Sequence, residues 1–282
     1  MRVFDAHIHV QPHQELTPRA RAAIMSGRSD TARVEEVLAS ADALLRLMDE
    51  ERIERAALVN YVAPDVMGLT AAVNPWIARY VEGHRDRLVP IGGVHPRHVA
   101  SVRDAMRELL DVQRVGGLKL HPPHMELAAN AYRFDCPGLA DFYRMAGEAG
   151  RPVLIHTGTS VFPGARNVYA DPLLCDDPAV DFPGTTFILC HAGRPLWYET
   201  AFFLARRHPN VHLDLSGIPP QKLLEVLPRL EEIADKVLWG SDWPSMGVAS
   251  MRRNADLFLA LPLSGEAKRR ILYDNADRLF PR

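Results

Sequence analysis

Two histidines follow the first apolar run of the chain with a spacing that suits metal binding. The run ends in the segment Asp5-Ala6-His7-Ile8-His9. In a β-strand alternate side chains point to the same face, so Asp5, His7 and His9 would share one face. Two imidazoles placed one above the other in this way can bind a single cation.

Three later apolar runs also end in residues that can bind a metal or move a proton, namely His156, His191 and Asp242. A lone histidine in an apolar strand is more often a core residue than a ligand. Several such residues, each at the end of its run, point instead to a common site. Three imidazoles, from His7, His9 and His156, together with Asp242 suit zinc, whose Lewis acidity lowers the pKa of bound water towards about 7.

The elements that would position these residues are eight short, apolar, β-branched runs spread along the whole chain. Most are hydrophobic almost without interruption, as expected of parallel strands that are buried on both faces. The runs are Val3–Val10, Ala56–Val62, Leu88–Val94, Val115–Leu120, Pro152–His156, Thr186–His191, Val211–Leu215 and Val237–Gly240.

Stretches with helical spacing lie between these runs, and Gly265–Phe280 would form a last helix. The others include Ala41–Arg52, Val99–Val112, Gly138–Ala149, Leu196–Arg207 and Gln221–Ile233. Alternating strands and helices imply βαβ units, and eight units predict an α/β TIM (β/α)₈ barrel, a single domain over residues 1–282. A doubly wound open sheet would show the same alternation, but eight units favour closure. Barrel enzymes carry their chemistry at the carboxyl ends of the strands, where these histidines and the aspartate lie.

Two longer insertions interrupt the alternation. Ser26–Ser40 follows the first strand, and Phe162–Pro183 follows the fifth. The second is rich in proline, glycine and acidic residues and is typical of a loop over the barrel mouth. Such loops usually shape the substrate pocket.

Composition limits the partners that the protein could have. The net charge is -2 and no tract of lysine or arginine occurs, which argues against nucleic acid. No stretch approaches the roughly 20 apolar residues of a membrane span, and the first residues do not have the pattern of a signal peptide. The three cysteines have unrelated spacings. We therefore expect a cytoplasmic enzyme with a small-molecule substrate, and a homodimer is possible.

The ordered motifs resemble the amidohydrolase superfamily, in particular its amidohydrolase-related branch, called amidohydrolase 2, of TIM-barrel hydrolases and decarboxylases. The resemblance covers essentially the whole chain. The motifs that carry it are Asp5-Ala6-His7-Ile8-His9, Gly117-Leu118-Lys119-Leu120-His121-Pro122, Ile155-His156-Thr157-Gly158, Cys190-His191-Ala192-Gly193, Gly240-Ser241-Asp242-Trp243-Pro244 and Asp274-Asn275-Ala276-Asp277-Arg278-Leu279-Phe280.

The resemblance implies that His7, His9 and His156 bind a metal ion, with Asp242 as a ligand, a base or both. It also implies that His191 polarises the substrate or transfers a proton near the metal. Members of the branch hydrolyse lactones, or decarboxylate or hydrate aromatic-ring breakdown products.

Several further residues are candidates for the substrate site. Superfamily members with two metal ions often carry a carbamylated lysine after the fourth strand. Here Lys119 shares a face with His121, and we expect one divalent ion, zinc or alternatively manganese. Arg194 could hold a substrate carboxylate through two hydrogen bonds, although a salt bridge at the strand end is equally compatible with its position. Lys119, His121 and Trp243 are the other candidate substrate-binding residues.

The remaining histidines carry less weight. His95 and His121 follow the third and fourth strands and could line the pocket. The others have no such position and are interpreted as structural or solvated: His13, His84, His98, His208 and His212.

The sequence predicts a metal-dependent hydrolase that acts on a small carboxylated or lactone-like substrate through a metal-activated water. Asp242 would accept the proton of the water and His191 would stabilise the developing oxyanion. The alternative is a non-oxidative decarboxylase of an aromatic or ring-cleavage acid, in which protonated Asp242 or His191 delivers a proton to carbon. A third reading is a barrel that binds a ligand without catalysis.

Overall fold

The computed structural model describes residues 1–245 and 247–280, and its centre is one parallel sheet of eight strands. The strands lie side by side in sequence order. They are β1 (Phe4–Ile8), β2 (Arg55–Val59), β3 (Leu88–Gly92), β4 (Gly117–Leu120), β5 (Val153–His156), β6 (Phe187–Cys190), β7 (Val211–Asp214) and β8 (Val237–Leu238).

The sheet closes between its first strand and the segment after its last strand. The Asp242 N–H donates to the His7 carbonyl at 2.9 Å, and the His9 N–H donates to the Trp243 carbonyl at 2.7 Å. The fold is therefore a single-domain (β/α)₈ TIM barrel, as the sequence predicts. Asp242 and the two first histidines lie next to each other at the closing seam.

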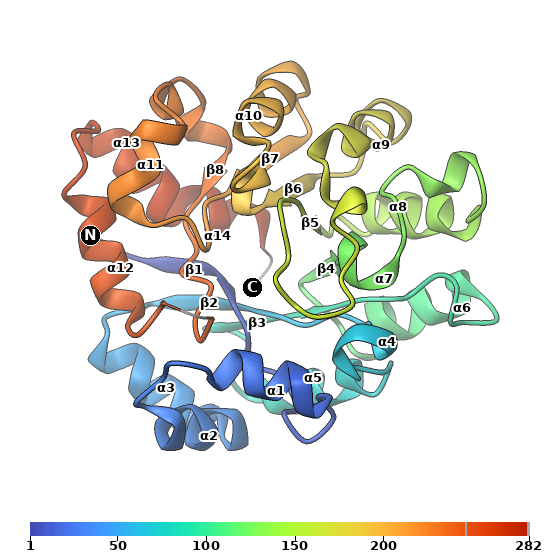
Figure 1. Ribbon diagram of the computed structural model, residues 1–282, viewed down its shortest axis with the longest axis horizontal. Coiled ribbons are helices and arrows are strands. Elements are labelled where there is room, and N and C mark those ends of the chain that lie inside the picture. Colours follow the sequence, from blue (N-terminus) through green and yellow to red (C-terminus); the bar gives the residue numbers. More distant parts are fainter. Residues whose placement is uncertain (246, 281–282) are drawn as a thin grey trace.

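Helices surround the barrel on all sides (Figure 1). None of the helices in the described part of the chain is long and apolar enough to cross a membrane. The helices are α1 (Pro18–Met25), α2 (Thr31–Ala39), α3 (Ala41–Glu50), α4 (Pro64–Met67), α5 (Val73–Tyr80), α6 (Val102–Arg107), α7 (Pro122–Met125), α8 (Gly138–Glu148), α9 (Asp176–Asp181), α10 (Tyr198–Arg207), α11 (Leu223–Val226), α12 (Met251–Leu259), α13 (Gly265–Arg269) and α14 (Asn275–Leu279).

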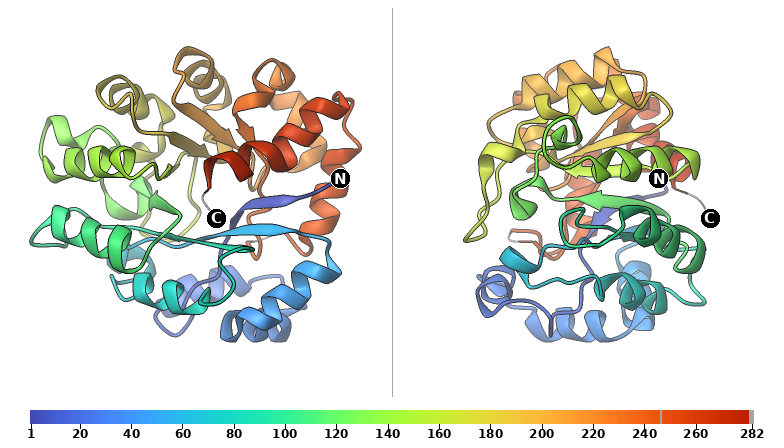
Figure 2. Two further views of the ribbon diagram at one scale, coloured as in Figure 1. Left: turned by 180° about the vertical axis from the view of Figure 1, so that it is seen from behind. Right: turned by 90° about the vertical axis from the view of Figure 1, so that its right-hand side faces the viewer.

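The core has two parts, which explains why the strands are hydrophobic on both faces. One buried cluster gathers strand side chains such as Phe4, Leu154 and Ile188 with Phe280, which follows α14. A larger cluster packs the other strand faces against the helices. α14 lies across the barrel near the start of β1, as the view from behind shows (Figure 2). The barrel mouth at the carboxyl ends of the strands is not covered by α14.

The structure departs from two sequence-based expectations, the helix Gln221–Ile233 and the loop Phe162–Pro183. The predicted helix Gln221–Ile233 is broken into α11 and two 3₁₀ segments, and Pro228, which lacks the N–H that a helix needs, lies at the break. The insertion Phe162–Pro183 contains 3₁₀ turns and α9, and Ser26–Ser40 contains α2. These short helices cover the barrel without altering the order of its strands.

Candidate active site

The end of β1 departs from regular strand geometry where its histidines begin. Phe4 and Ala6 pack in one cluster, whereas Ile8 and Val10 pack in the other. The β1–β2 pairing shifts register between Asp5 and Ile8, which accounts for the change of face. Strict alternation therefore does not hold through this segment, and the expectation of one face shared by Asp5 and both histidines is not met.

Asp5 has a structural place beside the site. Its Oδ1 accepts hydrogen bonds from the backbone N–H groups of Ser241 at 2.9 Å and His7 at 3.2 Å. Burial raises the pKa of the Asp5 carboxyl to about 7, although these bonds oppose the shift. Asp5 thus ties β1 to the segment that carries Asp242.

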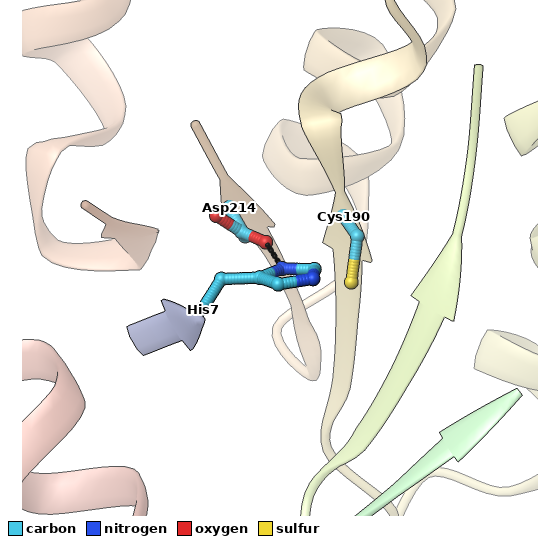
Figure 3. A group of neighbouring side chains, drawn as sticks. All are labelled: His7, Cys190 and Asp214. Carbon is cyan, nitrogen blue, oxygen red and sulfur yellow. Dashed lines mark hydrogen bonds and ion pairs between the residues drawn. The ribbon is translucent and has the colours of Figure 1, made fainter. Parts of the chain in front are cut away.

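His7 is oriented by a carboxylate on β7. Its Nδ1 lies 2.5 Å from Asp214 Oδ2, and both side chains are buried (Figure 3). A carboxylate at this position fixes the proton on Nδ1, so Nε2 carries the lone pair. That buried Nε2 has no hydrogen-bond partner among the described residues.

His9 is held in the same tautomer by a different acceptor. Its Nδ1 donates to the Val59 carbonyl at 3.0 Å, because a carbonyl can only accept. The Nε2 lone pair of a neutral His9 then faces Asp242 Oδ1 at 3.3 Å. Two lone pairs at this distance repel each other unless a proton or a metal cation lies between them.

The His9 and His7 nitrogens and the Asp242 oxygen fit a metal ion. Ligand atoms of all three residues lie within 4.8 Å of one another. His7 Nε2 is 3.9 Å from Asp242 Oδ1. Ligands about 2.0–2.2 Å from a tetrahedral zinc ion lie roughly 3.3 Å apart, which is the separation of His9 and Asp242. These residues form a candidate metal site.

His156 lies beside this group of three rather than within it. Its buried Nε2 has no hydrogen-bond partner in the described ranges 1–245 and 247–280. The ring stacks on His121 at 3.8 Å between centroids and meets the edge of His191 at 4.6 Å. His156 therefore offers an unused nitrogen next to the site, as a fourth ligand would.

His191 and Ser216 link the two sides of the cluster. His191 Nδ1 donates to the Ser216 carbonyl at 2.9 Å. The Ser216 hydroxyl donates to Asp214 Oδ2 at 2.8 Å and lies 2.9 Å from His191 Nδ1. The Nε2 of neutral His191 is consequently an acceptor. In this tautomer His191 suits proton acceptance better than the donation to an oxyanion that the sequence suggests.

The backbone at His191 and Asp242 is unusual. Both residues have a positive φ, 63° for His191 and 68° for Asp242, which residues other than glycine seldom adopt. Such conformations cost roughly 1–3 kcal/mol each and are common at functional sites. The barrel thus holds these two side chains at the mouth against a local preference.

The electrostatics of the site favour a carboxylate and neutral imidazoles. Burial favours the acid form of Asp242, but the contact with His9 and the charge of Arg194 outweigh it and hold its pKa below the usual range. Burial lowers the pKa values of His7, His156 and His191, and nearby cations add to the effect. Neutral imidazole is the form that binds a metal ion.

Lys119 contributes one of these cations from inside the barrel. It is buried, and its Nζ lies 3.0 Å from Cys190 Sγ. Its charge helps to lower the pKa of His7, after the larger effect of burial. Burial raises the pKa of the Cys190 thiol to about 12, so Cys190, which lies beside His7, is a neutral thiol near pH 7 (Figure 3).

The cluster opens into a cavity of about 400 Å³ at the barrel mouth. Of the candidate substrate-binding residues, Arg194 and His121 line this cavity and Lys119 and Trp243 do not. Lys119 is buried, and Trp243 belongs to the larger core cluster, between the strands and the helices. His95, in contrast to His121, lines a separate cavity.

Sequence reasoning missed Asp214 and Ser216. Asp214 had a signal, since it is a carboxylate near the end of the predicted strand Val211–Leu215. Neither could be placed against His7 without the barrel, because 207 residues separate His7 from Asp214.

The chain belongs to the amidohydrolase family, whose model, described as Amidohydrolase, matches residues 4–282. A stretch of it is similar to L-fucono-1,5-lactonase from Burkholderia ambifaria. The two are 33% identical over 81 residues, which cover 22% of this chain and 28% of the lactonase.

Solved structures share the fold over the whole length. An uncharacterised TIM-barrel protein from Bordetella bronchiseptica is 22% identical, with a TM-score of 0.77, covering 99% of this chain and 98% of that one. A dihydroxybenzoic acid decarboxylase from Polaromonas, with bound manganese and an inhibitor, is 18% identical, with a TM-score of 0.65, covering 99% and 96%. The chain is thus an amidohydrolase-family barrel with a candidate metal site of histidine and aspartate.

Proposed function

We propose that the protein hydrolyses the ester bond of a small lactone or a related carboxylated substrate. The observation that carries the proposal is that His9 Nε2 faces Asp242 Oδ1 at 3.3 Å. Beside them lies the Nε2 of His7, which has no hydrogen-bond partner among the described residues. This donor set suits one divalent ion. Such an ion, when bound, would polarise a carbonyl and make a water molecule more acidic.

The chain's own residues would supply the proton transfers. Asp242 carries a buried carboxylate whose Oδ2 lies 3.5 Å from Arg194 Nη2. It can accept a proton from the attacking water and pass it to the leaving alkoxide. His191 Nε2 is a second acceptor. Arg194, which lines the cavity, can hold a substrate carboxylate or the new acid group.

Decarboxylation is the competing proposal, because the fold is shared with the decarboxylase from Polaromonas. It requires a group that delivers a proton to carbon. The tautomer of His191 and the contacts of Asp242 with His9 and Arg194 suit acceptors rather than donors. Hydrolysis is therefore the better fit, and the lactonase similarity of part of the chain supports it.

One assay separates the two reactions. Protein loaded with zinc or manganese is incubated with sugar-acid lactones and with hydroxybenzoates, while acid release and carbon dioxide are both measured. We expect acid release from a lactone without carbon dioxide. Carbon dioxide from a hydroxybenzoate, with all lactones untouched, would refute hydrolysis in favour of decarboxylation.

The metal is a separate prediction. Protein purified without chelator is expected to contain about one zinc or manganese ion per chain, because His7, His9 and Asp242 place their ligand atoms within 4.8 Å of one another. Plasma mass spectrometry measures the content. Chelation should abolish turnover and zinc or manganese should restore it, whereas full activity after complete removal of metal would contradict the proposal.

Gly217 provides a test of Arg194 that leaves its charge in place. Gly217 has a φ of 68°, and a Cβ there would lie 1.6 Å from Arg194 Nη1 and 2.8 Å from Asp242 Oδ2. Gly217→Ala should therefore displace the guanidinium and raise KM for a carboxylated substrate by about tenfold, the scale of one charge-assisted hydrogen bond. Steady-state kinetics gives the value.

Gly83→Ala is the matched control. Gly83 has a similar φ of 81°, but no atom lies within 4 Å of the added Cβ. Both variants should lose stability through backbone strain, by about 1–2 kcal/mol. Only Gly217→Ala should change KM. Equal KM values for the two variants would show that Arg194 does not bind the substrate.

A further inference from the structure

Two polar side chains beyond the metal cluster face the same cavity without a partner. Gln11 and His13 line it together with His9. Both side chains are at least nine-tenths buried. Gln11 Nε2 and His13 Nδ1 have no hydrogen-bond partner among the residues that the structure describes. Sequence analysis passes over Gln11 and interprets His13 as structural or solvated.

The local backbone explains why these side chains point into the cavity. Val10, between His9 and Gln11, is fully buried in the larger core cluster, which lies between the strands and the helices. Its carbonyl accepts a hydrogen bond from Asn60 Nδ2 at 2.9 Å, which holds the segment against the loop after β2. With Val10 anchored outward, both His9 and Gln11 line the cavity.

Neighbouring protein groups do not satisfy the amide. The Tyr61 hydroxyl, which also lines the cavity, is already engaged at 3.1 Å with His124 Nδ1. Ile24 and Met67 are among the apolar side chains that line the same cavity. A buried amide N–H without an acceptor is unfavourable, so an oxygen atom from a ligand is the natural partner.

The charge of the cavity indicates what kind of oxygen this is. Among the described residues that line it, Arg194 is the one lysine or arginine side chain. Burial lowers the pKa of His13 to about 4, so His13 is neutral near pH 7. Neutral donors suit a hydroxyl or carbonyl oxygen, whereas a second carboxylate would find no lysine or arginine along the described cavity lining other than Arg194.

We propose that Gln11 and His13 form a subsite that binds a neutral oxygen of the substrate, a hydroxyl or carbonyl, in the same cavity as Arg194. The inference rests on the proposed function and narrows its substrate class to hydroxylated monoacids and their lactones. Gln11 donates to the substrate oxygen through Nε2. His13 lines the same cavity and offers Nδ1.

Binding of non-reacting acids tests the subsite apart from catalysis. Zinc-loaded protein is titrated by calorimetry with gluconate, with hexanoate, which has the same chain length without hydroxyls, and with glucarate, which adds a second carboxylate. Gluconate is expected to bind most tightly of the three. Because binding is measured, this ranking does not depend on whether the protein hydrolyses any lactone.

Gln11→Leu should weaken gluconate about threefold to tenfold, as expected for one hydrogen bond, and leave hexanoate unchanged. Gln11→Glu keeps the shape but removes the donor, and should weaken gluconate as well. Gln14→Leu is the matched control, because Gln14 is exposed three residues further on. Melting temperatures establish that each variant is folded.

Three results would overturn the subsite. They are gluconate binding no tighter than hexanoate, an equal loss for both acids in Gln11→Leu, and glucarate binding more tightly than gluconate. If the binding expectations are met but no lactone is hydrolysed, the proposed subsite is supported and the proposed reaction is refuted.

Discussion

Asp242→Asn is expected to lower kcat by about 10²- to 10⁴-fold, the usual contribution of a general base. Asparagine has the same shape, so its backbone can keep the bond from its N–H to the His7 carbonyl. The amide cannot accept the proton of an attacking water. Turnover is measured on the best lactone found, with metal content and melting temperature recorded on the same sample.

The metal content decides between the two roles of Asp242. Lost turnover with a normal metal content would assign it as a base, whereas loss of both would assign it as a ligand as well. Asp235→Asn makes the same chemical change at an exposed position and should behave as the unmodified protein. Near-normal turnover of Asp242→Asn would exclude both roles.

Asp214→Asn is expected to weaken metal binding about 10- to 100-fold, the usual effect of losing an outer partner of a ligating histidine. Asp214 holds His7 Nδ1 at 2.5 Å and accepts from the Ser216 hydroxyl at 2.8 Å. The neutral amide weakens the fixed tautomer of His7 and lowers the basicity of its Nε2. Competition with a fluorescent chelator measures the affinity.

Excess metal separates an effect on affinity from an effect on chemistry. If Asp214 acts through His7, saturating zinc should restore most of the turnover of Asp214→Asn, with Asp235→Asn as the control. An unchanged dissociation constant for zinc would show that His7 needs no carboxylate partner. A large loss of kcat that zinc cannot restore would place Asp214 closer to the reaction than its contacts indicate.

The barrel was predictable because its signal is local and repeated. Each strand is a short apolar run, and burial of both faces in the barrel requires that pattern. The helices were less predictable, since short or irregular ones leave weak periodicity. The segment 221–233 has helical spacing, yet Pro228 and the packing of its ends divide it.

The candidate site was predictable only where chemistry and strand ends coincide. His7, His9 and Asp242 stand at the ends of apolar runs and come together as that position predicts. Asp214 and Gln11 depend on tertiary contacts, with a histidine on another strand and with a cavity assembled from several loops. The enclosure of Lys119 against Cys190 likewise follows from the packing inside the barrel, which no sequence pattern specifies.

The close packing of the Arg194 guanidinium against Gly217 limits how this site can vary among homologues. The guanidinium and any side chain at 217 would occupy the same space, and the Gly217 carbonyl also accepts a hydrogen bond from Arg194 Nη1 at 2.5 Å. The two positions, on neighbouring loops, are therefore coupled. Homologous sequences should retain arginine at 194 only together with glycine at 217, and a larger residue at 217 should accompany a different anion-binding solution.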